Sequence, residues 1–206
     1  LRSKLEFKVN DNITIGGNAV ISNALRFDPE YSAWRAAYYA VPILPILDPS
    51  NTGATPVNYA NAQDLGYRGG QNPFPLLDFT ENRNKIRNVL ANFYTQIAII
   101  PEKLNFRTSY NHNYESIETR EIRLPYFIGN NFQREDASIL RRNINISNQI
   151  WDNTLTYTDN FGKHGLTVLG GTSFRDESLE LLQAGGLNFP LSGTESYYID
   201  QAQTIV

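Results

Sequence analysis

The chain has 206 residues, no cysteine, two histidines and a nearly balanced charge of 18 basic and 21 acidic side chains. The composition has no basic surplus to hold a phosphate backbone, which argues against nucleic acid as a partner. The lack of cysteine excludes disulfides and thiolate metal sites. No stretch approaches the ~18 consecutive apolar residues of a membrane helix, but a membrane barrel hides its lipid-facing residues at every second position.

Residues 1–21 predict a β-hairpin, because apolar and charged side chains alternate along them. One face of the first arm carries Leu1, Ser3, Leu5, Phe7 and Val9, and the other carries Arg2, Lys4, Glu6 and Lys8. After a turn at 10–12, the alternation resumes on the return arm with Ile13, Ile15, Gly17, Ala19 and Ile21 on one face. The register is firmly specified, since a slip of one residue would turn every side chain to the opposite face.

The alternation stops in residues 22–85, a segment rich in proline and glycine. A connection of this length is typically functional or disordered. Within it, Asp28 and Pro29 predict the start of a short helix, and Pro42 its end near residue 40. Tyr31, Trp34 and Tyr38 would share one face of this helix. Their rings either pack the segment onto itself and the sheet rim, or contact a ligand or partner.

Residues 86–113 predict a second hairpin, with a turn at 100–103 and alternating apolar positions on both arms. A long polar connection follows at 114–140. It contains three glutamates, for which a solvated loop is favoured over a catalytic carboxylate pair, and the ring pair Tyr126 and Phe127.

Residues 141–174 predict a third hairpin around a turn at 159–163, and residues 175–206 a third long connection. The apolar positions of the first arm change parity: Ile144, Ile146 and Ile150 are even, whereas Trp151 and Leu155 are odd. A β-bulge near residue 150 is the usual cause of such a change.

The lengths of the connections decide between a soluble β-sandwich and a membrane barrel, which both bury one face of antiparallel strands. Short turns alternate with long connections, as in outer-membrane barrels with short periplasmic turns and long extracellular loops. Six strands cannot close around a wide lumen. The prediction is therefore an all-β, antiparallel, up-and-down segment of a large transmembrane barrel, with hairpins at 1–21, 86–113 and 141–174, outer loops at 22–85, 114–140 and 175–206, and the plug and remaining barrel outside this piece.

Three motifs resemble one family. The arms N-T-L-T-Y and K-H-G-L-T-V-L-G-G of the third hairpin, the loop run V-P-I-L-P-I-L-D and the turn I-P-E-K-L look like those of SusC/RagA-type TonB-dependent outer-membrane transporters. This resemblance implies a barrel of about 22 strands, an N-terminal plug, energy delivered through TonB, and a SusD-like surface lipoprotein that covers the barrel as a lid. It also implies the outer membrane of a Gram-negative, Bacteroidetes-like bacterium as the location.

The resulting functional prediction is import of a large nutrient, an oligosaccharide or oligopeptide, without enzymatic activity. The alternative is a surface glycan- or protein-binding β-barrel or β-sandwich that transports nothing. We expect no catalytic residue, no metal ligand and no cofactor, because the two histidines are far apart and no nucleophile or phosphate-loop motif is present. The partners expected are the lipoprotein, TonB through an N-terminal region, the nutrient and outer-membrane lipid. The candidate contact residues for substrate or lid are Trp34, Tyr38, Tyr126 and Phe127.

Overall fold

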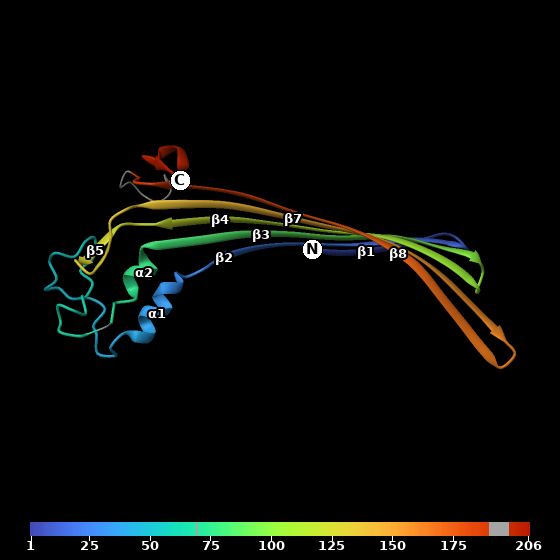
Figure 1. Ribbon diagram of the computed structural model, residues 1–206, viewed down its shortest axis with the longest axis horizontal. Helices are drawn as coiled ribbons and strands as arrows, with labels where there is room; N and C mark the ends of the chain where they lie inside the picture. Colours follow the sequence, from blue (N-terminus) through green and yellow to red (C-terminus); the bar gives the residue numbers. More distant parts are fainter. Residues whose placement is uncertain (69, 190–197) are drawn as a thin grey trace. The chain divides into compact units, whose positions relative to one another are not determined.

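Long antiparallel strands make up most of the chain (Figure 1). The structure is a computed structural model, and it describes residues 1–68, 70–189 and 198–206. The principal strands are β1 (Arg2–Asn10), β2 (Ile13–Phe27), β3 (Thr80–Ile100), β4 (Leu104–Arg123), β7 (Ser138–Phe161) and β8 (His164–Leu187). The shorter elements are α1 (Tyr31–Tyr39), α2 (Phe74–Asp78), β5 (Tyr126–Gly129), β6 (Phe132–Arg134), a 3-10 turn (Ile199–Gln201) and β9 (Thr204–Ile205).

One sheet contains the long strands in the order β1-β2-β3-β4-β7-β8-β9, and β5 pairs with β6 in a second, small sheet. Successive long strands are therefore neighbours, which is the up-and-down topology expected from the sequence. In this order β1 and β8 are not paired with each other, so the sheet is open. The strands run past the predicted boundaries: β2, β3, β4 and β8 all continue into segments that the sequence pattern assigns to loops.

The chain divides into two compact units. Unit 1 comprises Leu1–Ala24, Ile86–Ile117 and Ile144–Leu181, and unit 2 comprises Leu25–Lys85, Glu118–Asn143 and Leu182–Val206. Unit 1 contains the sheet around the three short turns. Unit 2 contains the helices, the small sheet and the remaining parts of the long strands.

The first hairpin of unit 1 has the predicted register. Leu5 pairs with Gly17 and Phe7 with Ile15 on one face, while Glu6 pairs with Gly16 on the other. The three turns lie at one end of the sheet, as expected. The amide of Ala98 donates to the Asn12 carbonyl at 2.7 Å, and the amide of Thr158 donates to the Lys103 carbonyl at 2.8 Å.

The predicted bulge near Ile150 is wrong. On β7, Asn148, Asp152 and Thr158 form side-chain hydrogen bonds with Glu177, Ser173 and Thr167 of β8. Between successive pairs, the residue number rises on β7 by as much as it falls on β8, so the antiparallel register is unbroken. The change in apolar parity therefore comes from a change in which face is apolar, while the backbone pairing stays regular.

Unit 2 contains all the buried apolar side chains of the described residues. One cluster is built around Tyr59, Phe79, Tyr126, Ile128 and Phe132, and a second around Ile122, Ala137, Ile139 and Phe189. The predicted loop helix exists, but it begins at Tyr31 and Asp28 does not cap it. Asp28 instead forms an ion pair with Arg26 at 2.8 Å and accepts a hydrogen bond from Asn84 at 2.7 Å.

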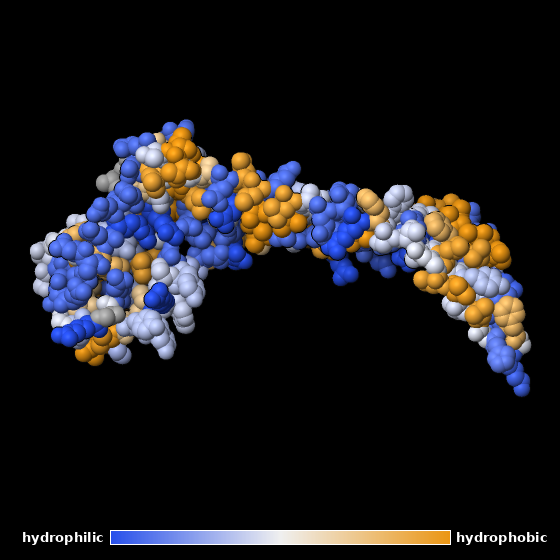
Figure 2. Space-filling model, in the orientation of Figure 1, coloured by the Kyte–Doolittle hydropathy of each residue, from blue (hydrophilic) through white to orange (hydrophobic). Residues whose placement is uncertain are grey.

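Unit 1 is different, because its apolar side chains lie on the surface. Leu5 is 78% exposed, Phe7 68% and Phe93 60%. In Figure 2 apolar side chains gather along the strands near the short turns. In the described part of the chain, no helix is long and apolar enough to cross a membrane.

Candidate functional site

The two faces of the unit 1 sheet differ in chemistry, and contacts between strands identify the members of each. Phe93 lies beside Gly17, which pairs with Leu5, so these three residues share the apolar face. The next residue on β3, Tyr94, faces the other way and donates a hydrogen bond to Glu6 at 2.6 Å. Further along the apolar face, the Trp151 indole donates to Thr108 at 2.8 Å.

The opposite side is called here the polar face of unit 1. Its central residues are Glu6, Tyr94, Arg107, Asn92, Asn111, Asp152 and Ser173. They come from β1, β3, β4, β7 and β8, five strands of the seven-stranded sheet. Successive side chains of a strand point to opposite faces of the sheet, so the polar residues that alternate with the apolar ones all lie on this face.

The Tyr94 ring lies against Gly16 on this face. A side chain at Gly16 would overlap the Tyr94 ring, so the absence of a Cβ there gives the ring its position. The guanidinium carbon of Arg107 is 4.3 Å from the centre of the same ring, in cation–π contact. Glu6, Tyr94 and Arg107 thus form a continuous arrangement from β1 to β4.

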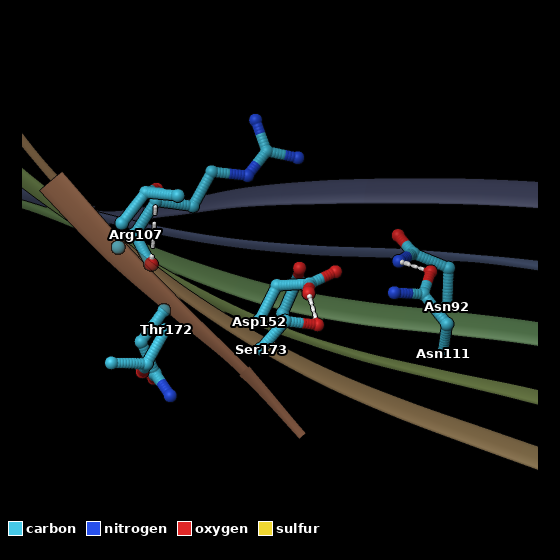
Figure 3. Close-up of a pocket in the computed structure, with 10 residues that line it drawn as sticks. Asn92, Arg107, Asn111, Asp152, Thr172 and Ser173 are labelled. Carbon is cyan, nitrogen blue, oxygen red and sulfur yellow. Dashed lines mark hydrogen bonds between the residues drawn. The ribbon is translucent and has the colours of Figure 1, made fainter. Parts of the chain in front are cut away.

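An open cavity of about 550 Å³ lies on the polar face, between β3 and β8 (Figure 3). Two hydrogen-bonded pairs line it: Asn92 donates to Asn111 at 2.5 Å, and Ser173 donates to Asp152 at 2.6 Å. The Arg107 guanidinium reaches away from the Asp152–Ser173 pair in Figure 3. The cavity therefore combines amide, hydroxyl and carboxylate groups with one cation, a lining suited to polar solutes.

The turns of the second and third hairpins are joined by an ion pair. Lys103 Nζ lies 2.9 Å from Asp159, which also accepts a hydrogen bond from Tyr157 at 2.8 Å. The hydrogen bond and charge of Asp159 raise the pKa of Lys103 above its ordinary value. This ion pair joins the two turns to each other.

The structure separates the four candidate contact residues that the sequence suggests. Trp34 and Tyr38 on α1 are 75% and 78% exposed, so their rings are available to another molecule. Tyr126 is only 6% exposed. Phe127 is half-buried, and its backbone pairs with Thr55 at 2.8 Å in both directions.

Tyr126 belongs to a packed aromatic group of unit 2. Its ring centre lies 5.5 Å from that of Phe79 and 5.4 Å from that of Phe132. Arg134 lies over its ring at 5.2 Å. Burial raises the pKa of Tyr126 and lowers that of Arg134, because both groups lose solvent around their charged forms. Of the four rings, those of Trp34 and Tyr38 are the most exposed.

A second cavity of about 510 Å³ lies within unit 2 beside α1. Arg35, Tyr39, Gln63, Gln71 and Asn131 are among its lining residues. Sequence reasoning did not find either cavity, since the lining residues are ordinary polar side chains brought together by strand pairing and loop packing. Among the described residues no cluster of three or more histidines, aspartates and glutamates could hold a metal ion.

The chain has recognisable relatives, although no family model matches it. It is 26% identical over 174 residues to TonB-dependent receptor P3 of Formosa agariphila, an alignment that covers 84% of this chain and 15% of that receptor. The fold is similar to the structure of the RagAB peptide transporter, with a TM-score of 0.69 and 16% identity over 98% of this chain and 22% of the other. An 'open-open' structure of the RagAB peptide importer gives a TM-score of 0.64 at 15% identity.

These comparisons agree with the motifs of the third hairpin and with the open antiparallel sheet. The chain spans less than a quarter of the length of each of these proteins. None of them is named as an enzyme. The sequence similarity and the shared fold together confirm the resemblance of this chain to a segment of a SusC/RagA-type TonB-dependent transporter β-barrel.

Proposed function

We propose that the chain forms part of the wall of an outer-membrane barrel that imports a large nutrient, an oligosaccharide or oligopeptide, with energy supplied through TonB. The observation that carries the proposal is the exposed apolar face of unit 1. None of the buried apolar side chains of the described residues belongs to unit 1, yet Leu5, Phe7 and Phe93 stand exposed on one side of its sheet. Water tolerates such a face poorly, whereas lipid covers it at no cost, and the polar face then lines the lumen.

Adjacent residues of β2 test the membrane assignment. Ile15 belongs to the apolar face and Thr14, which pairs with Lys8, to the polar face. In the full-length protein, Ile15→Lys places a charge in lipid and costs up to about 2–4 kcal/mol if it lies near the midplane, while Thr14→Lys faces water. The measurement is the urea midpoint for unfolding from lipid vesicles. Equal effects of the two substitutions would show that the faces are assigned incorrectly.

Transport is tested in cells that carry the full-length protein. Labelled oligosaccharides and oligopeptides should accumulate when TonB is present, and accumulation should stop when TonB is deleted. Surface binding that continues at the same level without TonB, with no accumulation in either strain, would instead identify a binding protein that does not transport.

The exposed rings of α1 are proposed as contacts for a SusD-like lipoprotein lid or for the nutrient. Tyr and Trp offer large apolar area with a polar tip and lose little side-chain entropy on binding. Trp34→Ala with Tyr38→Ala should weaken lid affinity or uptake and leave barrel assembly unchanged, because both side chains are exposed. The matched control is Tyr198→Ala, a 55% exposed ring of unit 2 outside α1. If the double variant and this control behave alike in both assays, the rings of residues 34 and 38 have no special role.

A further inference from the structure

The polar face of unit 1 carries more positive than negative charge on its first four strands. Strand alternation puts Arg2, Lys4 and Lys8 on the same side of β1 as Glu6. Tyr94 contacts Glu6, and Arg107 lies over Tyr94, so Arg107 of β4 belongs to this face as well. Four cations thus lie on this face around Glu6, and Glu115, eight residues further along β4 from Arg107, is a more distant carboxylate of the same face.

These four cations are not neutralised within the described part of the chain. The ion pairs of unit 1 join Lys103 with Asp159 and Arg175 with Glu177, and they include none of the four. Glu6 accepts a hydrogen bond from the Tyr94 hydroxyl, and none of the ion pairs found among the described residues includes Arg107. This part of the polar face therefore has a net positive charge that can bind an anionic ligand.

Protection of a sheet edge does not account for this pattern. Lysines on an edge strand do prevent unwanted pairing, and β1 is at one edge of this sheet. Arg107, however, lies on β4, which is paired on both sides. The cations follow one face across the sheet instead of following one edge, and that arrangement points to a ligand above the face.

We propose that this part of the polar face binds an oligomer that carries repeated carboxylate groups. Arg107, held over Tyr94, presents a planar fork that matches a carboxylate, and the lysines act as point charges beside it. Alternate residues of a strand are about 7 Å apart, so Arg2 and Lys4 meet successive acidic groups of an extended chain. The inference rests on the proposed import function and narrows its substrate class. Acidic oligosaccharides and acidic peptides share this chemistry, and the experiment distinguishes them.

The test uses full-length protein in detergent and isothermal titration calorimetry at low salt. The acidic probes are tetragalacturonate and tetraglutamate, and the neutral probes are maltotetraose and tetraglutamine. At least one acidic probe should bind more tightly than its neutral counterpart, and the difference should shrink at about 0.5 M salt because screening removes it. The probe that binds identifies the source of the carboxylates.

Three variants give the expected pattern of affinities. Lys4→Gln combined with Lys8→Gln and Arg107→Gln should weaken the acidic probe about tenfold and leave neutral probes within about twofold. Glu6→Gln should strengthen acidic binding, since it removes the carboxylate that lies between Lys4 and Lys8, while its side-chain oxygen still accepts a hydrogen bond from Tyr94. Lys163→Gln, at the exposed β7–β8 turn, is the matched control and should change nothing. Heat modifiability on gels checks that each variant is folded.

Two results would overturn the inference. One is equal affinity for acidic and neutral probes in the unchanged protein, and the other is an unaltered preference in the triple variant. The proposed import function is judged separately, by TonB-dependent accumulation of any of the four probes. Accumulation of neutral probes without acidic preference would refute the carboxylate site and retain the import function. A preference for acidic probes without TonB-dependent accumulation would retain the carboxylate site and refute the import function.

Discussion

Replacement of Tyr126 by alanine tests whether the loop region has its own core. The side chain is 6% exposed and packs between Phe79 and Phe132, with Arg134 over the ring. Truncating a buried aromatic ring typically costs about 3–5 kcal/mol, and lost aromatic pairs are part of that cost. We expect about 3 kcal/mol here, the lower end, because Tyr126 is in unit 2, where the surrounding loops can partly collapse.

Hydrogen exchange in the full-length protein measures this effect without unfolding the barrel. The relevant amides are those of β5 and β6, which pair with each other through Tyr126 and Arg134. A loss of 3 kcal/mol in the free energy of local opening corresponds to exchange faster by roughly two orders of magnitude. Amides of the unit 1 hairpins should exchange at unchanged rates.

The matched comparison is Trp34→Ala, which removes a larger ring that is 75% exposed. An exposed side chain outside a packed contact changes stability by about 0.5 kcal/mol or less, so exchange in β5 and β6 should increase by no more than about twofold. The reasoning fails if the two alanine variants accelerate exchange equally. It also fails if Tyr126→Ala leaves the β5 and β6 amides protected.

Three further outcomes are expected. Gly16→Ala should displace the Tyr94 ring and abolish its contact on the polar face; ultraviolet resonance Raman of a Tyr94-labelled sample should report the lost hydrogen bond, and an unchanged spectrum would contradict the close packing. Burial raises the pKa of Tyr59 to about 12. The stabilising contribution of the neutral Tyr59 side chain is therefore complete below about pH 10 and is lost as the pH rises through 12. Protease cleavage of unit 2 should increase over that pH range, and Tyr59→Phe should remove this pH dependence. In intact cells, an impermeant thiol reagent should label cysteine at Asp64 and spare cysteine at Asn160, and equal labelling would reverse the orientation; Asn61 is unsuitable as a probe because it is 4% exposed.

Strand pairing in unit 1 could be predicted because it follows from a period of two residues. Leu5 opposite Gly17 and Phe7 opposite Ile15 require only the alternation and a short turn. The same alternation predicts which side chains are apolar at each level of the sheet. It does not indicate where a strand ends, since β8 continues through polar and apolar residues alike to Leu187.

The core of unit 2 could not be predicted, because long-range side-chain contacts define it. The Asn51 amide donates to the carbonyls of Tyr59 at 2.9 Å and Ile128 at 3.0 Å, which joins two loops far apart in sequence. Asn72 is 1% exposed and donates to the Ile46 carbonyl at 2.7 Å. In a sequence, such asparagines indicate turns, and nothing local shows that they satisfy buried carbonyls. For this reason Tyr126 resembled a free loop ring, although it is a core residue.

The error at Ile150 has a structural cause that bears on function. A strand needs about 9–11 residues to cross a membrane, whereas β7 and β8 each have 24. Once a strand leaves the hydrocarbon, no rule keeps the same face apolar, and on β7 the apolar positions pass from Trp151 to Ile150 and Ile146 on the other side. The excess length of these strands continues into unit 2, where Ile139 of β7 packs against Phe189. The long connections therefore include regular strands and have their own buried clusters. Helix α1, which carries the exposed Trp34 ring, packs against one of these clusters through Ala33.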